Sequence, residues 1–158
     1  MKAHLLFFFT LILNANMIVA KETEKVAAVL DALHIAASKA DTKVYFNLFT
    51  ENAVFIGTDV SEYWTIEQFK SYTSPFFEKG QGWTYVPKSR NIYFSKSGDI
   101  AWFHEILHNE SYGTTRGTGV LAFDKDKGWR IAQYHLTFPI PNDLAKGMTE
   151  KIKAFEAN

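Results

Sequence analysis

The spacing of apolar positions predicts two helices ahead of the first strand. Apolar residues recur at helical spacing through 22–40, which is typical of an amphipathic helix. Asp41 fits the N-cap of a second, short helix that ends at Phe49. The β-branched and aromatic run 53–56 then predicts a strand, and the glycine at position 57 can end or bend it.

A third helix and a sheet are predicted next. Thr65 and Gln68 form a capping-box pattern, and Gly80 fits the end of this helix after Pro75 has started a new turn or kinked it. From Trp83 onward apolar and polar residues alternate, so one face of each strand is expected to be buried. Strands are expected at 84–86, 91–95, 100–108, 115–124 and 129–138. Consecutive strands with short turns between them pair antiparallel.

The end of the chain predicts one more helix. Prolines at 139 and 141 end the sheet because proline cannot donate to its hydrogen-bond ladder. Asn142 is expected to cap a last helix in which Leu144, Met148, Ile152 and Phe155 share a face. Helices followed by an antiparallel sheet make this an α+β fold, with one domain over residues 21–158.

The first twenty residues have the layout of a secretory signal peptide. Lys2 precedes the apolar run 5–13, and Ala20 supplies a small residue at the expected cleavage point. The apolar run is short of the roughly 20 residues that a membrane-spanning helix needs. Residues 1–20 are therefore predicted to be a signal peptide and the protein to be periplasmic or secreted, with no membrane contact after removal. The alternative is that the segment is retained as a membrane anchor.

Composition narrows the function classes. The chain has no cysteine, so export brings neither disulfides nor a lipid-modified cysteine. Removing Lys2 from the 17 basic residues leaves 16 against 17 acidic ones, and this near-neutral balance argues against a nucleic-acid partner. The chain is rich in aromatic residues, with 14 Phe, 7 Tyr and 4 Trp, which indicates a large core or an aromatic-lined cavity.

Two segments carry a family resemblance. The segment KGWRIAQYHLT (127–137) resembles the closing strand of SnoaL-like domains and of the association domain of calcium/calmodulin-dependent kinase II. Ala40-Asp41 with LFTENAV (48–54) is similar to the matching segment of the same nuclear transport factor 2-like superfamily. The resemblance implies a cone-shaped roll, in which a curved antiparallel sheet wraps around N-terminal helices and leaves a pocket between them. The superfamily holds enzymes, binding domains and assembly domains, so the fold does not decide the function.

The resemblance also allows functional positions to be compared. The general-base aspartate of ketosteroid isomerase corresponds to Gly57, its oxyanion-hole acid to Gly119 and its oxyanion-hole tyrosine to Leu33. Enolisation needs a base and acidic donors, and none of these groups is present at those positions. The pocket arginines of the kinase association domain fall on His104, Gly119 and Leu136, which predicts a weakened preference for anions.

Side chains alternate across a strand, so the carried-over positions fix which neighbours face the pocket. Asp59 and His104 are the candidate catalytic or hydrogen-bonding pair, although structural roles, as an Asp that caps the 60–64 turn and a His satisfied in the core, remain open. The predicted ligand pocket consists of Tyr45, Phe55, Asp59, Trp102, His104, Tyr134 and Leu136.

The opposite faces of the same strands collect a second polar set. We expect a structural polar network or dimer interface, with Arg116 and Glu105 as its ion pair, although a solvated face or a catalytic cluster remain alternatives. The two glycines beside Arg116 do not form a nucleotide loop and are expected to allow a bulge or close approach of the helices. The set consists of Glu105, Arg116, Thr118, Gln133 and His135.

Three functions remain open. The histidines after residue 20 lack ligand spacing, so no metal and no cofactor is predicted. The leading hypothesis is a domain that binds a small, largely apolar molecule in its cone, as a homodimer. The alternatives are an isomerase, cyclase or hydrolase that uses Asp59 and His104 as acid and base, and a non-catalytic structural dimer module with a filled cone.

Overall fold

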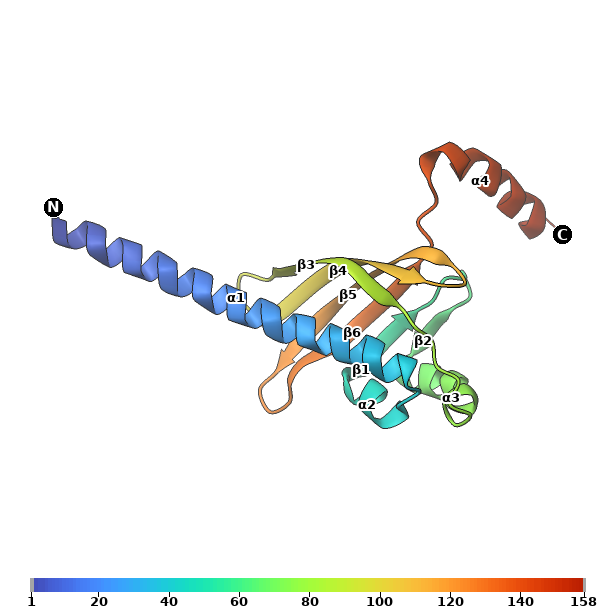
Figure 1. The fold of residues 1–158 in the computed structure, drawn as a ribbon, viewed down its shortest axis with the longest axis horizontal. Helices are drawn as coiled ribbons and strands as arrows, with labels where there is room; N and C mark the ends of the chain where they lie inside the picture. Colours follow the sequence, from blue (N-terminus) through green and yellow to red (C-terminus); the bar gives the residue numbers. More distant parts are fainter. Residues whose placement is uncertain (1, 158) are drawn as a thin grey trace.

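In the described part of the chain, four helices and six strands follow one another in the order α1 α2 β1 β2 α3 β3 β4 β5 β6 α4 (Figure 1). The computed structural model describes residues 2–157, with side chains described for residues 17–157. The helices are α1 (Lys2–Ser38), α2 (Thr42–Asn47), α3 (Ile66–Phe77) and α4 (Asn142–Glu156). The strands are β1 (Phe49–Ile56), β2 (Tyr63–Thr65), β3 (Val86–Phe94), β4 (Ile100–Asn109), β5 (Gly113–Asp124) and β6 (Gly128–Thr137).

The strands form one curved sheet in the order β2-β1-β6-β5-β4-β3, which confirms the predicted α+β class and the cone. Consecutive strands pair antiparallel from β3 to β6, but β1 pairs parallel with β6. The prediction of a purely antiparallel sheet is thus wrong for this one strand pair. It rested on short turns between consecutive strands, and β1 and β6 are not consecutive. The strands predicted at 84–86 and 91–95 are a single edge strand, β3, in which Pro87 marks a register shift.

Local signals predicted the starts of α2 and α3 correctly. The predicted ends were late, because Phe49, expected to end α2, begins β1, and α3 ends at Phe77, before Gly80. The Asp41 side chain accepts a hydrogen bond from the Val44 N–H, and the Thr65–Gln68 capping box is fully formed. Asn142 was expected to cap α4, but it is the first helical residue, and Pro141 occupies the cap without a side-chain hydrogen bond. The proline ring restricts the backbone just before the helix, so α4 can begin here without a side-chain acceptor at the cap.

The core lies between α1 and one face of the sheet. Val26, Leu30, Leu33 and Ala37 follow one another at helical spacing and are all buried against it. The N-terminal half of α1 extends beyond the sheet (Figure 1), and its described side chains there, Met17 to Val19, are exposed. Among the described residues, no helix combines the length and the apolar character that crossing a membrane requires.

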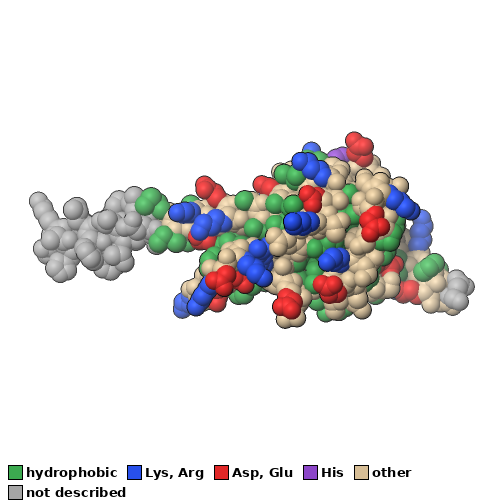
Figure 2. Space-filling model, turned by 90° about the horizontal axis from the view of Figure 1, so that it is seen from below, with side chains coloured by type: hydrophobic (Ala, Val, Ile, Leu, Met, Phe, Trp, Pro, Cys, Tyr) green, Lys and Arg blue, Asp and Glu red, His purple; other side chains and the backbone are tan. Residues whose placement is uncertain are grey.

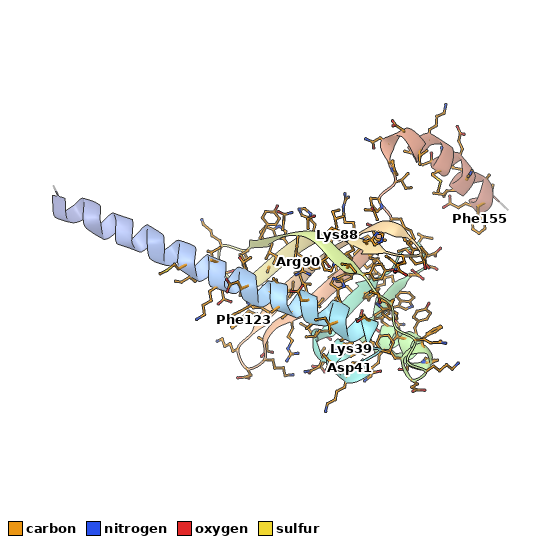
Figure 3. All side chains as sticks on the ribbon, viewed as in Figure 1. Lys39, Asp41, Lys88, Arg90, Phe123 and Phe155 are labelled. Atoms are coloured by element: carbon orange, nitrogen blue, oxygen red, sulfur yellow. The ribbon has the colours of Figure 1, made fainter. Side chains whose placement is uncertain are left out.

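The helix α4 stands apart from the rest of the molecule. It follows the extended segment after β6 and projects from the opposite end to α1 (Figure 1). Its predicted apolar face exists, but none of its described residues is buried, and Phe155 near its end is 83% exposed (Figure 3). The helix therefore contributes nothing to the core that shapes the cone.

Two glycines of β5 make room inside the cone. A Cβ at Gly117 would collide with the Tyr134 hydroxyl and lie 3.0 Å from a Glu105 carboxylate oxygen, and one at Gly119 would lie 2.8 Å from the Phe103 ring. These glycines were expected to allow a bulge or a close approach of the helices, and a register shift does follow them at Val120 and Leu121. They make room for parts of the neighbouring strands β4 and β6: the Tyr134 and Glu105 side chains at Gly117, and the Gln133 backbone carbonyl with the Phe103 ring at Gly119.

The substitution Gly117→Ala is expected to lower the free energy of unfolding by about 1–3 kcal/mol, since the added methyl group must displace Tyr134 or Glu105. Urea unfolding followed by circular dichroism measures this loss. Gly147→Ala is the matched control, because its added Cβ meets nothing within 4 Å and lies in a helix, where alanine is favoured. Equal stability of the two variants would contradict the crowding at Gly117.

Candidate functional site

The carboxylate of Glu105 is fully buried at the centre of the cone. His34 Nε2 lies 2.8 Å from Glu105 Oε1, and the Tyr134 hydroxyl donates to the same oxygen over 3.1 Å. Arg90 Nε donates to the other oxygen, Oε2, over 2.8 Å. We call these four residues the buried carboxylate network. Its members come from α1, β3, β4 and β6, so one acidic group joins four separate elements.

Arg90 extends this network to the surface of α1. Its Nη1 donates to the Asp31 carboxylate over 2.8 Å and to the Ala27 carbonyl over 3.2 Å. Figure 3 shows Arg90 on β3 beside α1, and the pairing of β3 with β4 places Arg90 directly opposite Glu105. The guanidinium therefore clamps α1 to the edge of the sheet with charge-assisted hydrogen bonds.

The network sets the charge states of Glu105 and Tyr134. Burial alone would raise the pKa of Glu105, but the hydrogen bonds and charges of His34 and Arg90 outweigh burial and hold it below the ordinary value of 4.5. Burial and the neighbouring Glu105 carboxylate raise the pKa of Tyr134 well above 10. Near neutral pH, Glu105 is thus an anion and Tyr134 a protonated donor.

The space next to this network is nearly filled. A deep cavity of only about 20 Å³ reaches His34 and Tyr134, between α1 and the sheet. Such a volume suits about one water molecule, well below the size of an organic ligand. Aromatic rings account for the filling: Phe55 stacks on Tyr134 with ring centroids 5.6 Å apart and on Phe69 at 3.8 Å.

A larger cavity opens at the wide end of the cone. This mouth cavity has a volume of about 340 Å³ and shares Phe55, Trp83, Tyr85 and Leu136 with the deep cavity below it. Nine of its fifteen lining residues are aromatic. The lining consists of Phe55, Gly57, Thr58, Glu62, Trp64, Phe69, Tyr72, Phe76, Gln81, Gly82, Trp83, Tyr85, Tyr112, Leu136 and Phe138.

One carboxylate is held in the wall of the mouth cavity. Glu62 Oε2 accepts the backbone N–H of Thr58 over 2.8 Å and that of Asp59 over 3.1 Å. A Cβ at Gly57 would collide with this same oxygen, so the glycine is what lets the carboxylate lie against the backbone. Glu62 is therefore oriented before any ligand arrives.

The predicted pocket residues divide into two groups. Tyr45, Phe55, Tyr134 and Leu136 line the deep cavity, and two of them, Phe55 and Leu136, also line the mouth cavity. Trp102, His104 and Asp59 line neither of these two cavities.

His104 and Trp102 were expected to face inward, and this orientation is wrong. Burial along β4 alternates with the odd positions inside, so both side chains point to the other face of the sheet, and Trp102 is 45% exposed. Asp59 lies in the exposed turn between β1 and β2, where its carboxylate accepts the Ser61 N–H over 2.8 Å. Serine hydrogen bonds lower the pKa of Asp59. The Asp59–His104 pair therefore has no shared cavity in which to act as acid and base.

The second polar set is also divided. Arg116, Thr118, Gln133 and His135 lie on the outer face of the sheet, which is the face turned away from α1, and the register aligns Thr118 with His135. Glu105 was assigned to this face, and that assignment is wrong, because its carboxylate is buried among donors inside the cone. Its ion-pair partner is accordingly Arg90 and not Arg116.

Sequence reasoning missed His34, Arg90 and Glu62. His34 follows Leu30 and Leu33 on the buried side of the first helix, a position that does point into the cone. Arg90 faces Glu105 if residues are counted outward from the turn at 97–99. Glu62 lies in a polar turn, and nothing in the sequence pattern sets it apart there.

Other features of the described part of the chain are weaker candidates for a functional site. A hollow of about 610 Å³ between α2 and α3 lies outside the cone and mixes Lys43 and Lys70 with Glu51 and Glu67. No group of three or more His, Cys, Asp or Glu in the described residues is arranged to hold a metal ion. On the face shown in Figure 2, basic and acidic side chains are interspersed, without a patch of one sign.

Comparisons with known proteins agree with this geometry. The sequence profile described as SnoaL-like domain matches residues 26–141, which leaves out most of the segment before the core and all of α4. No curated protein matches the chain by sequence.

Solved structures of similar shape come from several bacteria. A nuclear transport factor 2-like protein of unknown function from Pseudomonas putida matches with a TM-score of 0.62 and 14% identity, covering 78% of this chain and 90% of its own. A proposed dehydratase from Streptomyces avermitilis has a TM-score of 0.65 and 11% identity, covering 77% and 99%. A proposed ketosteroid isomerase from Shewanella frigidimarina has a TM-score of 0.56 and 21% identity, covering 69% and 91%. At these identities the likeness concerns the fold.

Glu105→Gln is expected to lower the free energy of unfolding by about 1–3 kcal/mol at neutral pH, because the half-buried Arg90 then keeps only Asp31 as a charged partner. The folded pKa of Glu105 is lowered, so its contribution is complete above 4.5 and is lost as the pH falls through the folded value. Urea unfolding at a series of pH values should show the two proteins converging in acid. The exposed Glu110→Gln is the control, and parallel curves for Glu105→Gln would refute the charged network.

Proposed function

Because the chain belongs to the SnoaL-like domain family, we propose that it is an exported domain that binds a small, largely apolar molecule in the mouth of its cone and acts as a homodimer. The fold is compatible with small-molecule binding and with isomerase- or dehydratase-type activity. The observation that carries binding is the aromatic mouth cavity of about 340 Å³, which is within the size range of small-molecule sites.

The shape of the cone separates the three hypotheses for function. The deep part of the cone is filled, which is what the hypothesis of a structural module predicts. The wide end is open and lined with exposed aromatic rings such as Tyr72 and Phe76. Exposed apolar clusters of this kind mark binding surfaces more often than structural ones. The positions of Asp59 and His104 give the acid-base mechanism no geometric support, so binding is the function we propose.

Export is supported by how α1 divides along its length. Among the described side chains of α1, which begin at Met17, contacts with the rest of the domain start after residue 20: Glu22 accepts a hydrogen bond from the Trp129 indole over 2.8 Å, and Val26 is fully buried. Side chains just before that point, Met17 to Val19, are exposed. Cleavage after Ala20 would therefore leave every described core contact of α1 in place.

Dimer formation is supported by the uncovered outer face of the sheet. Tyr93 stacks on Trp102 with ring centroids 5.9 Å apart, and both rings remain 45% exposed. Around these rings lie the polar side chains Arg116, Thr118 and His135, in a mixture typical of the rim of an interface. A second copy of this chain fits such a face because aromatic and polar groups can be matched symmetrically about a two-fold axis.

Binding is tested with para-tert-butylbenzyl alcohol, a neutral probe of suitable size, by titration against the fluorescence of Trp64 and Trp83. Tyr72→Ala is expected to weaken binding about fivefold or more, because the Tyr72 ring stacks on Trp64 in the cavity wall. Phe155→Ala removes an exposed ring on α4, outside both the cavity and the outer face of the sheet, and should leave the affinity unchanged. The absence of a saturable signal in the unmodified protein would sink the proposal.

The dimer is tested by sedimentation equilibrium of residues 21–158. The protein is expected to sediment as a dimer and Trp102→Glu as a monomer, because a charge would be buried in the interface without a partner. Tyr63→Glu, at an exposed position on the edge strand β2, is the control and should remain dimeric. A monomer at every concentration of the unmodified protein would contradict the assignment of the outer face.

A further inference from the structure

The mouth cavity combines aromatic rings with a single fixed charge. On one side, Trp64 and Tyr72 stack with ring centroids 5.1 Å apart, and Phe76 adjoins them at 5.8 Å. A second pair, Tyr112 and Phe138, lies 5.1 Å apart and comes from the β4–β5 turn and the segment after β6. Tyr72, Phe76, Tyr112 and Phe138 are each at least 42% exposed, so solvent reaches their ring surfaces.

The charge of this cavity is negative. Glu62 is the one charged side chain among the residues that line it, and no lysine, arginine or histidine is among them. Its Oε2 is held by two backbone N–H groups, while no hydrogen bond to Oε1 is formed by the described residues. The effect of the carboxylate reaches the cavity floor: burial raises the pKa of Tyr85 to about 12, with Tyr112 and Glu62 adding to the rise.

Ring faces carry the negative end of the aromatic quadrupole, so they attract cations and do so best when several surround one site. The fixed carboxylate acts in the same direction. An anion would meet repulsion from Glu62 and find no basic partner among the lining residues, and a neutral molecule would gain only from burial.

We propose that the mouth cavity is a site for an organic cation, a quaternary or alkylated ammonium group carried on an apolar body, with Glu62 as its counter-ion and the rings of Trp64, Tyr72 and Tyr112 around it. This inference rests on the proposed function and specifies the charge of the ligand. The apolar body would extend toward Phe55 and Leu136, which form the passage to the deep cavity.

Three para-substituted benzyl alcohols test the charge. Para-tert-butylbenzyl alcohol is neutral, para-(trimethylammonio)benzyl alcohol is its cationic isostere, and para-(hydroxymethyl)benzoate is an anion. Titration calorimetry at physiological ionic strength should show the cation binding about tenfold or more tightly than the neutral probe, from ring and carboxylate attraction together. The anion is expected to bind more weakly than both.

Glu62→Gln separates the charge from the shape of the site, because an amide oxygen can still accept the N–H groups of Thr58 and Asp59. It should weaken cation binding about fivefold or more and change binding of the neutral probe by less than about twofold. Asp59→Asn is the matched control: it removes the same charge from the neighbouring exposed turn, where solvent and salt screen it. Circular dichroism establishes that both variants are folded.

The outcomes distinguish this inference from the function on which it rests. Equal binding of the cationic and neutral probes would overturn the cation site and leave apolar binding standing. A cation preference that survives Glu62→Gln would overturn the role of Glu62. Failure of all three probes to bind would overturn both the cation site and the proposed binding function.

Discussion

The buried charge of Glu105 is the constraint on which the rest of the cone depends. A carboxylate withdrawn from water costs several kcal/mol unless donors replace its hydration. Here His34, Arg90 and Tyr134 supply those donors, and each of them belongs to a different element. The helix α1, the edge strand β3 and the closing strand β6 must therefore all be in place before Glu105 is satisfied. Apolar packing alone would let α1 slide or rotate on the sheet, whereas these hydrogen bonds fix its register.

This requirement also determines where the cone is closed and where it is open. Tyr134 must reach Glu105, and Gly117 clears the space for its hydroxyl. Phe55 stacks on the Tyr134 ring and Phe69 stacks on Phe55, so these rings fill the volume above the network. Only about 20 Å³ remains at depth. The free space is pushed to the wide end, where α3 and the loops end and aromatic rings have no further layer to cover them.

The sequence predicted the elements and the class of the fold better than the directions of the side chains. Helical spacing, the Asp41 cap and the Thr65 capping box are local signals, and the structure contains each of them. Alternation in β4 defines two faces but does not say which is inside. Apolar residues at 101, 103 and 107 favoured the odd face, but it also carries Glu105, whose burial is acceptable only with Arg90 opposite.

A bulge explains why the inward-facing positions were predicted wrongly in β4 but correctly in β6. The register between β5 and β6 shifts at Val120 and Leu121, so the inward positions of β6 change from odd to even along the strand. Tyr134 and Leu136 were therefore placed correctly while His104, two strands away, was not. Alternation carries no signal for such an insertion. The fixed orientation of Glu62 was hidden for a different reason, since it depends on a backbone that only Gly57 allows to come close.

The contacts within the deep network decide which part of the cone can discriminate among ligands, although Arg90 Nη2 has no hydrogen-bond partner among the described residues. The Glu105 carboxylate takes a hydrogen bond from each of the other three members of the network, and the remaining Arg90 contacts go to Asp31 and Ala27. A ligand is kept from these charged groups because the cavity beside them is too small to admit one. Glu62 differs in both respects: its carboxylate is fixed, and it lines an open cavity. Selection by charge must therefore take place at the mouth, where rings and carboxylate act together, while the buried charge beneath them maintains the shape.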